Sequence, residues 1–93
     1  MRIPAHVRVK RFVQYEIVWQ DVIKGDIDCL GLCDSSTKHI YLKRGQSKTE
    51  AFKTYIHELT HAICFEYDID IPHRSVYKLE TAVLKVLKLN KLL

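Results

Sequence analysis

Hydrophobic and polar positions alternate along the first part of the chain. Between Val7 and Trp19 most odd positions are apolar or aromatic, and most even positions are polar or charged. A period of two with many β-branched and aromatic side chains is typical of β-strands. The segment therefore predicts one long strand, or two strands joined by a turn near Lys10 and Arg11. Residues 21–28, which hold Gly25 among polar side chains, predict a loop.

Two short apolar runs follow this loop. They cover residues 29–33 and 39–43, and the segment between them reads Asp-Ser-Ser-Thr-Lys. Aspartate and serine favour turns because their side chains bond to nearby backbone groups. The two runs therefore predict a β-hairpin.

The pattern then changes to the period of a helix. Ser47 followed by Glu50 is a capping-box pattern, in which each residue bonds to the backbone of the other. The residues from Lys48 to about Tyr67 contain no Gly and no Pro, so they predict one continuous helix. Its expected core-facing stripe consists of Phe52, Tyr55, Ile56, Leu59, Ile63 and Tyr67.

A second helix is expected after a short connection. Pro72 suits the first turn of a helix, and Asn90 is a plausible C-terminal breaker. A connection this short makes the two helices antiparallel neighbours. The apolar stripe expected on the second helix consists of Val76, Leu79, Val83, Val86 and Leu87.

These elements predict a single α+β domain over residues 1–93. A small twisted antiparallel or mixed sheet packs on the helix that begins after Ser47, and an antiparallel C-terminal helix follows. The 93 residues are 47% hydrophobic and 28% charged, which excludes a disordered chain. No apolar run has the length needed to span a bilayer, so we expect no membrane association.

The charge and the cysteines limit the setting of the protein. A formal net charge of +4 is mild and favours a solvated basic face over a nucleic-acid site, although nucleic acid stays possible as a partner. The three cysteines, Cys29, Cys33 and Cys64, are odd in number and contain no Cys-x-x-Cys pair. With no signal-peptide pattern, they predict a reducing, cytoplasmic location.

The most informative motif is His57-Glu58-Leu59-Thr60-His61, which lies inside the first predicted helix. A spacing of four places His57 and His61 on the same helix face, so both imidazoles can bind one ion. Neutral imidazoles are good Zn²⁺ ligands, and Glu58 beside them can take a proton from a zinc-bound water. The motif therefore predicts a zinc site with Glu58 as the catalytic general base.

With this motif the chain resembles a minimal zincin metallopeptidase. It is similar to the SprT-like and ImmA-like groups, to the minigluzincins and to small phage-encoded proteins of that kind. The similarity runs from about Gly31 to Asn90, and only the His-Glu-x-x-His motif in it is highly specific. The resemblance implies hydrolysis of peptide bonds, and an edge strand that binds an extended peptide or protein substrate. In this chain the edge-strand role falls to His39–Lys43 or to its partner.

The third zinc ligand is left as a choice between two residues. The position six residues after His61, where metzincins have histidine, is Tyr67, so that class is excluded. His73 and Glu80 remain, and they lie about 10 Å apart along one helix, so both cannot bind one ion. Helix geometry favours Glu80, whereas the SprT-like resemblance favours His73. We take His73 as the third ligand and Glu80 as its alternative.

The implied reaction is metal-assisted peptide hydrolysis. Tyr67, Tyr77 or a non-liganding His73 are the candidates to stabilise the oxyanion of the reaction, and the sequence does not select among them. The alternative is a latent or non-catalytic zinc-binding regulatory module with the same fold, for which nucleic acid is a candidate partner. His6 and His39 are expected to be surface residues.

Overall fold

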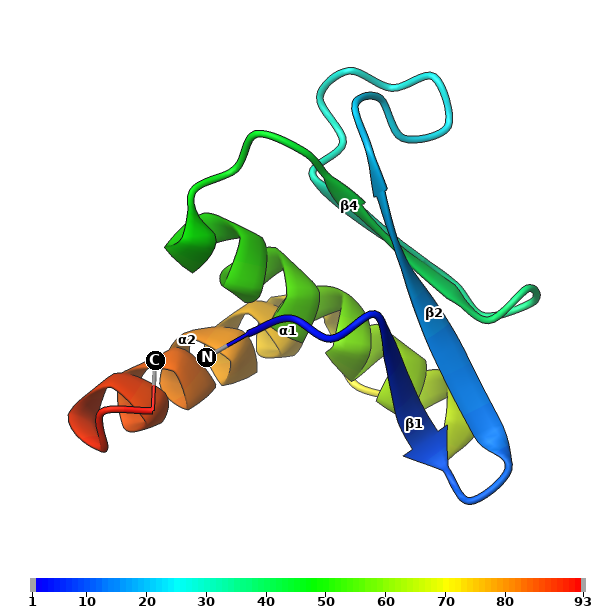
Figure 1. The fold of residues 1–93 in the computed structure, drawn as a ribbon. Helices are drawn as coiled ribbons and strands as arrows, with labels where there is room; N and C mark the ends of the chain where they lie inside the picture. The colour runs from blue at the N-terminus through cyan, green and yellow to red at the C-terminus, as the bar shows by residue number, and fades with distance from the viewer. Residues whose placement is uncertain (1, 93) are drawn as a thin grey trace.

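The computed structural model describes residues 2–92, and Figure 1 shows its sheet and two helices. The expected α+β class is confirmed. The sheet is mixed, with strand order β1-β2-β4-β3; β2 and β4 are parallel and the other two pairs are antiparallel. The elements are β1 (His6–Lys10), β2 (Val13–Gln20), β3 (Gly31–Asp34), β4 (His39–Lys43), α1 (Lys48–Glu66) and α2 (His73–Leu89).

The N-terminal alternating segment forms two strands with a turn at Arg11 and Phe12, which confirms the second of the two alternatives. Burial in β2 follows the predicted alternation. Tyr15 and Ile17 are buried, while their neighbours Gln14 and Glu16 are exposed. Successive side chains of a strand point to opposite faces of the sheet. One face of β2 therefore lies in the core and the other faces solvent.

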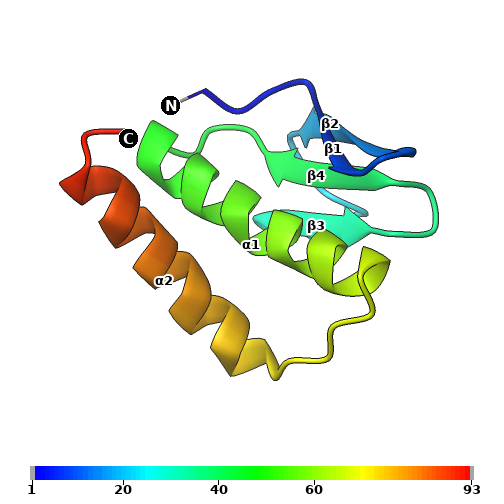
Figure 2. The same ribbon diagram turned by 90° about the horizontal axis from the view of Figure 1, so that it is seen from below.

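The predicted hairpin of β3 and β4 is confirmed. Its turn is stabilised by Asp34, whose Oδ1 accepts hydrogen bonds from the backbone and hydroxyl of Ser36 and from the backbone N–H of Thr37. β4 pairs with β2 on its other side, so His39–Lys43 is an interior strand and not an edge. The free edge belongs to its partner β3, which lies over α1 in Figure 2.

Helix α1 begins as the capping pattern predicts. Ser47 accepts a hydrogen bond of 3.1 Å from the backbone N–H of Glu50; within residues 2–92 only this half of the capping box forms. The buried face of α1 includes Phe52, Tyr55 and the small Ala62, which packs close under the sheet. Ile63 and Tyr67 were expected in this face, but they are 37% and 51% exposed. Tyr67 is the C-cap of α1, and its hydroxyl bonds to the backbone of Val9 instead of entering the core.

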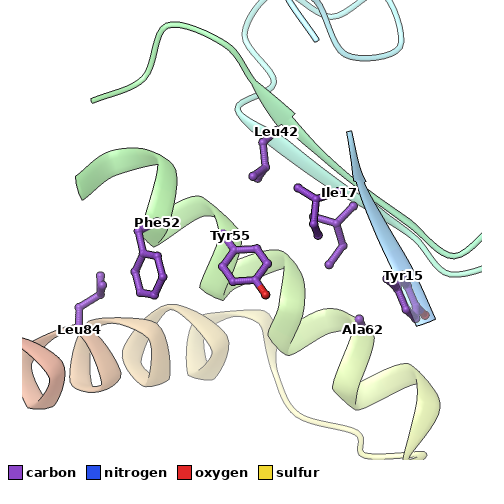
Figure 3. Close-up of a cluster of buried hydrophobic side chains, with 8 residues drawn as sticks. Tyr15, Ile17, Leu42, Phe52, Tyr55, Ala62 and Leu84 are labelled. Carbon is purple, nitrogen blue, oxygen red and sulfur yellow. The ribbon is translucent and has the colours of Figure 1, made fainter. Parts of the chain in front are cut away.

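The core lies between the sheet and the two helices, as Figure 3 shows. Burial of each large apolar side chain contributes about 1.5–3 kcal/mol to folding. The sheet, α1 and α2 all contribute to the cluster, which is formed by Tyr15, Ile17, Ile40, Leu42, Phe52, Tyr55, Ala62 and Leu84.

Helix α2 has the expected bounds but a different buried face. Pro72 is its N-cap and Asn90 its C-cap. Val76, Glu80 and Leu84 are its buried residues, and the row i, i+4, i+8 that they form packs on α1. The expected Leu79 and Val86 are therefore 47% and 56% exposed. The buried stripe of α2 therefore includes Glu80, which is 2% exposed and is hydrogen-bonded to His57 of α1.

Within residues 2–92 no helix has both the length and the apolar character required to cross a membrane.

A charged network joins the end of α1 to the sheet. The Glu66 carboxylate is 8% exposed and accepts hydrogen bonds from Lys38 Nζ and from Tyr15 Oη, the latter at 2.6 Å. These bonds, that of Lys38 first, lower the pKa of Glu66, while burial raises the pKa of Tyr15.

We expect this network to make stability depend on acid pH. Since the pKa of Glu66 is lower in the folded than in the unfolded chain, its contribution is complete above the ordinary glutamate pKa of about 4.3 and is lost as the pH falls below it. Urea unfolding of Glu66→Gln and wild type at pH 3–7 measures this. The stability difference should shrink toward acid pH, and a constant difference would contradict the role of the charge.

Candidate metal centre

His57 and His61 lie one turn apart on α1 and face the same side. Their Nε2 atoms are 3.2 Å apart, and their ring centroids are 4.8 Å apart. Both side chains are half-buried, so they are held in place yet still open to solvent. The helical spacing alone explains this arrangement.

His73 joins this pair from the first residue of α2. Its ring lies 5.1 Å from that of His57 and 5.0 Å from that of His61. One ligand nitrogen from each of the three residues lies within 4.8 Å of the others. A tetrahedral ion with metal–nitrogen bonds of 2.0–2.1 Å needs its nitrogens about 3.3–3.4 Å apart. The His57–His61 pair is already at 3.2 Å, and the third nitrogen lies close enough for the three residues to hold a metal ion.

Glu80 lies behind His57 rather than beside the three histidine nitrogens. Its Oε2 accepts a hydrogen bond of 2.9 Å from His57 Nδ1. This bond places the proton of His57 on Nδ1. The Nε2 atom, which faces His61, then keeps a free lone pair with which it can bind a metal ion. The structure therefore brings His73, and not Glu80, into the group with His57 and His61.

The connection between the helices explains why helix geometry favoured Glu80 although His73 lies in the histidine group. If both helices continued to a reversal near residues 69–70, Glu80 would lie level with His61. In the structure α1 ends at Glu66, and residues 69–72 are not helical. An extended residue advances about 3.3 Å and a helical one 1.5 Å, so the chain returns to the level of His61 after fewer residues. His73 reaches this level and Glu80 lies beyond it.

Glu58 is buried directly beside the histidines. It is 8% exposed and accepts a hydrogen bond from the backbone N–H of Cys33. Burial first, and then the charge of Glu80, raise the pKa of Glu58 to about 7, while the Cys33 bond opposes this shift. Burial, followed by the neighbouring His57 and His73, lowers the pKa of His61 and favours the neutral ring that a metal requires.

The position of Gly31 was not recognised from the sequence as part of the site. A Cβ atom there would lie 2.4 Å from Thr54 Cγ2 and 3.1 Å from Glu58 Cγ. Only glycine allows β3 to lie so close above Glu58. A glycine inside a strand often marks such a close approach of backbone, and this signal could have identified it.

The free edge of β3 faces the site. Lys43 N–H donates to Leu30 O at 2.9 Å, which makes this pair a hydrogen-bonded one. Bonded and non-bonded pairs alternate in an antiparallel ladder, so the peptide groups of Gly31 and Cys33 point away from β4. Two contacts agree with this orientation of the peptide groups. Cys33 N–H donates to Glu58, and Gly31 O accepts from the thiol of Cys29 at 3.1 Å.

Two hollows meet at the site and form one groove along this edge. Both are lined by Gly31, His57, Glu58 and Tyr77. On both sides the lining mixes apolar with polar side chains, and the second side carries more charged ones. The further lining residues are Leu32, Cys33, Ser35, His61, Phe65 and His73 on the first side, and Asp26, Cys29, Leu30, Glu50, Lys53, Thr54 and Glu80 on the second.

His39 lies outside this group, where its ring contacts the Thr37 hydroxyl at 3.0 Å. His6 is exposed on β1, as expected for a surface residue. The three cysteines are free thiols outside the histidine group.

We expect the Glu80 contact to tighten metal binding. Loss of a hydrogen-bond partner of a ligand histidine typically weakens metal affinity 10–100-fold. Glu80→Ala should therefore raise the zinc Kd, measured by competition with a chromophoric chelator, by about that factor. Glu16→Ala, at an exposed position of β2, is the matched control. An unchanged Kd in Glu80→Ala would show that the contact has no effect on the site.

No family model, no curated protein and no solved structure matches this chain.

Proposed function

We propose that this protein is a zinc-dependent metallopeptidase. The observation that carries the proposal is the convergence of His57, His61 and His73, with ligand nitrogens within 4.8 Å of one another and the Glu58 carboxyl beside them. Three protein ligands are the usual number at catalytic zinc sites, whereas structural sites usually have four. His57, His61 and His73 would hold the ion, and Glu80 would orient His57.

When zinc is bound, it supplies a Lewis acid that lowers the pKa of a water molecule toward neutrality and polarises a peptide carbonyl. Glu58 removes a proton from the attacking water and delivers it to the departing amine nitrogen. The backbone N–H of Cys33 interacts with the Glu58 carboxyl and favours its charged form, which is the form that acts as a base. The walls around Glu58 exclude solvent, which strengthens its electrostatic interactions.

The substrate in this proposal is an extended segment of peptide or protein. The outward N–H of Gly31 and C=O of Cys33 can pair with such a segment, as in other cases of strand addition to a sheet edge, whereas Gly31 O and Cys33 N–H already contact Cys29 and Glu58. This pairing would carry the substrate backbone across His57 and Glu58, along the groove. The cytoplasmic location expected from the cysteines remains part of the proposal.

Metal analysis combined with a cleavage assay tests this function. The full chain is loaded with zinc, its metal content is measured, and a mixture of unstructured peptides is analysed by mass spectrometry before and after incubation. We expect one zinc per chain, cleavage that chelation abolishes, and recovery when zinc is restored. One zinc without cleavage would favour the non-catalytic regulatory module, and absence of zinc binding would overturn both.

A further inference from the structure

Three side chains were candidates to stabilise the oxyanion that forms during peptide hydrolysis. The structure removes two of them from this role. Tyr67 donates its hydroxyl to the backbone carbonyl of Val9 at 2.8 Å, and His73 lies within the histidine group. Tyr77 is the remaining one.

Tyr77 lies on α2, one turn after His73. Its ring centroid is 4.7 Å from that of His57 and 5.0 Å from that of His73. It is 53% exposed, and within residues 2–92 its hydroxyl has no hydrogen-bond partner. The hydroxyl is therefore available to a molecule in the groove.

Tyr77 and Glu58 approach the groove from different elements. Glu58 is on α1 beneath β3, where Gly31 leaves room for it, and Tyr77 is on α2, which packs on the other side of α1. Both line the two hollows at the point where these meet. A carbonyl placed there has a base on one side and a hydroxyl donor on the other.

We propose that Tyr77 is a catalytic residue whose hydroxyl donates a hydrogen bond to the oxyanion. The inference rests on the proposed peptidase function. Water oxygen forms a bond to the carbonyl carbon, Glu58 takes one water proton, and the π electrons of the carbonyl move onto its oxygen. Tyr77 donates to this oxygen while keeping its own proton. When the C–N bond breaks, the electrons return to form C=O, and the proton on Glu58 passes to the amine.

The geometry assigns the hydroxyl a role distinct from that of the ring. The ring contacts with His57 and His73 would be the same for phenylalanine, so Tyr77→Phe removes the donor alone. Loss of one donor to an oxyanion typically lowers kcat by about 10²–10³. Because the hydroxyl acts on charge that develops in the transition state, KM should change little.

The experiment uses the zinc-loaded full chain, with Tyr67→Phe as a matched loss of a tyrosine hydroxyl outside the groove. Tyr77→Phe should lower kcat about 10²–10³-fold and leave KM and zinc content unchanged, whereas Tyr67→Phe should leave all three unchanged. Equal kcat in Tyr77→Phe and wild type would overturn the proposal. Loss of zinc from Tyr77→Phe would also overturn it, since the hydroxyl would then serve the metal site.

A binding measurement separates this inference from the peptidase function itself. A peptide phosphonate carries tetrahedral anionic oxygens like those of the reaction, and its Kd is measured by calorimetry without any turnover. Tyr77→Phe should weaken its binding at least about tenfold, even if the wild-type chain cleaves no peptide tested. Unchanged affinity, or no binding to wild type, would overturn the role of Tyr77.

Discussion

Replacement of Glu58 by glutamine is expected to reduce peptide cleavage about 10²–10⁴-fold without loss of zinc. This range is the usual contribution of a positioned general acid or base. Glutamine has the shape of glutamate but cannot accept a proton from water at neutral pH. Since zinc would be held by the three histidines, the metal content of the variant should equal that of wild type.

The surroundings of Glu58 favour a folded variant. Burial disfavours the charge of this carboxyl, and a neutral amide fits the same space. The amide oxygen can still accept the Cys33 N–H. Glu16→Gln, at an exposed position of β2 outside the groove, is the control and should retain activity. Undiminished cleavage by Glu58→Gln would exclude the general-base mechanism.

Local spacing was sufficient to predict the part of the site that lies on α1. A helix fixes the relative positions of His57, Glu58 and His61 through its own geometry, so the motif and the cap at Ser47 predicted that the three lie together on α1. The hairpin turn was also predictable, because Asp34 forms its bonds within three residues.

The remaining features depend on contacts between distant segments, which a periodic pattern does not encode. The parallel pairing of β2 with β4 makes β3 the edge, and no local signal distinguishes this from other strand orders. The buried face of α2 includes Glu80, because its partner His57 comes from α1. Hydropathy alone would assign that place to Leu79.

Replacement of His73 by alanine is expected to remove most of the stabilisation that zinc gives to the fold. At free zinc 100 times the Kd, binding stabilises the folded state by about 2.7 kcal/mol. For a domain of this size each kcal/mol shifts Tm by about 4–8 °C, so zinc should raise the wild-type Tm by about 10–20 °C. Loss of a direct ligand should weaken binding more than the roughly 100-fold that loss of a supporting contact can cause. The shift in the variant should then fall to about 3 °C or less.

Without zinc the same substitution should change little, because His73 is exposed and alanine is a strong helix former. Thermal unfolding with and without zinc measures both effects, and His6→Ala, at an exposed histidine of β1, should keep the full zinc shift. A full shift in His73→Ala would mean that another residue completes the site. Glu80 is poorly placed for this, since its carboxylate bonds to Nδ1 of His57 while the metal would bind on the Nε2 side. To become a ligand, Glu80 would have to release the contact that orients His57, so the two roles oppose each other.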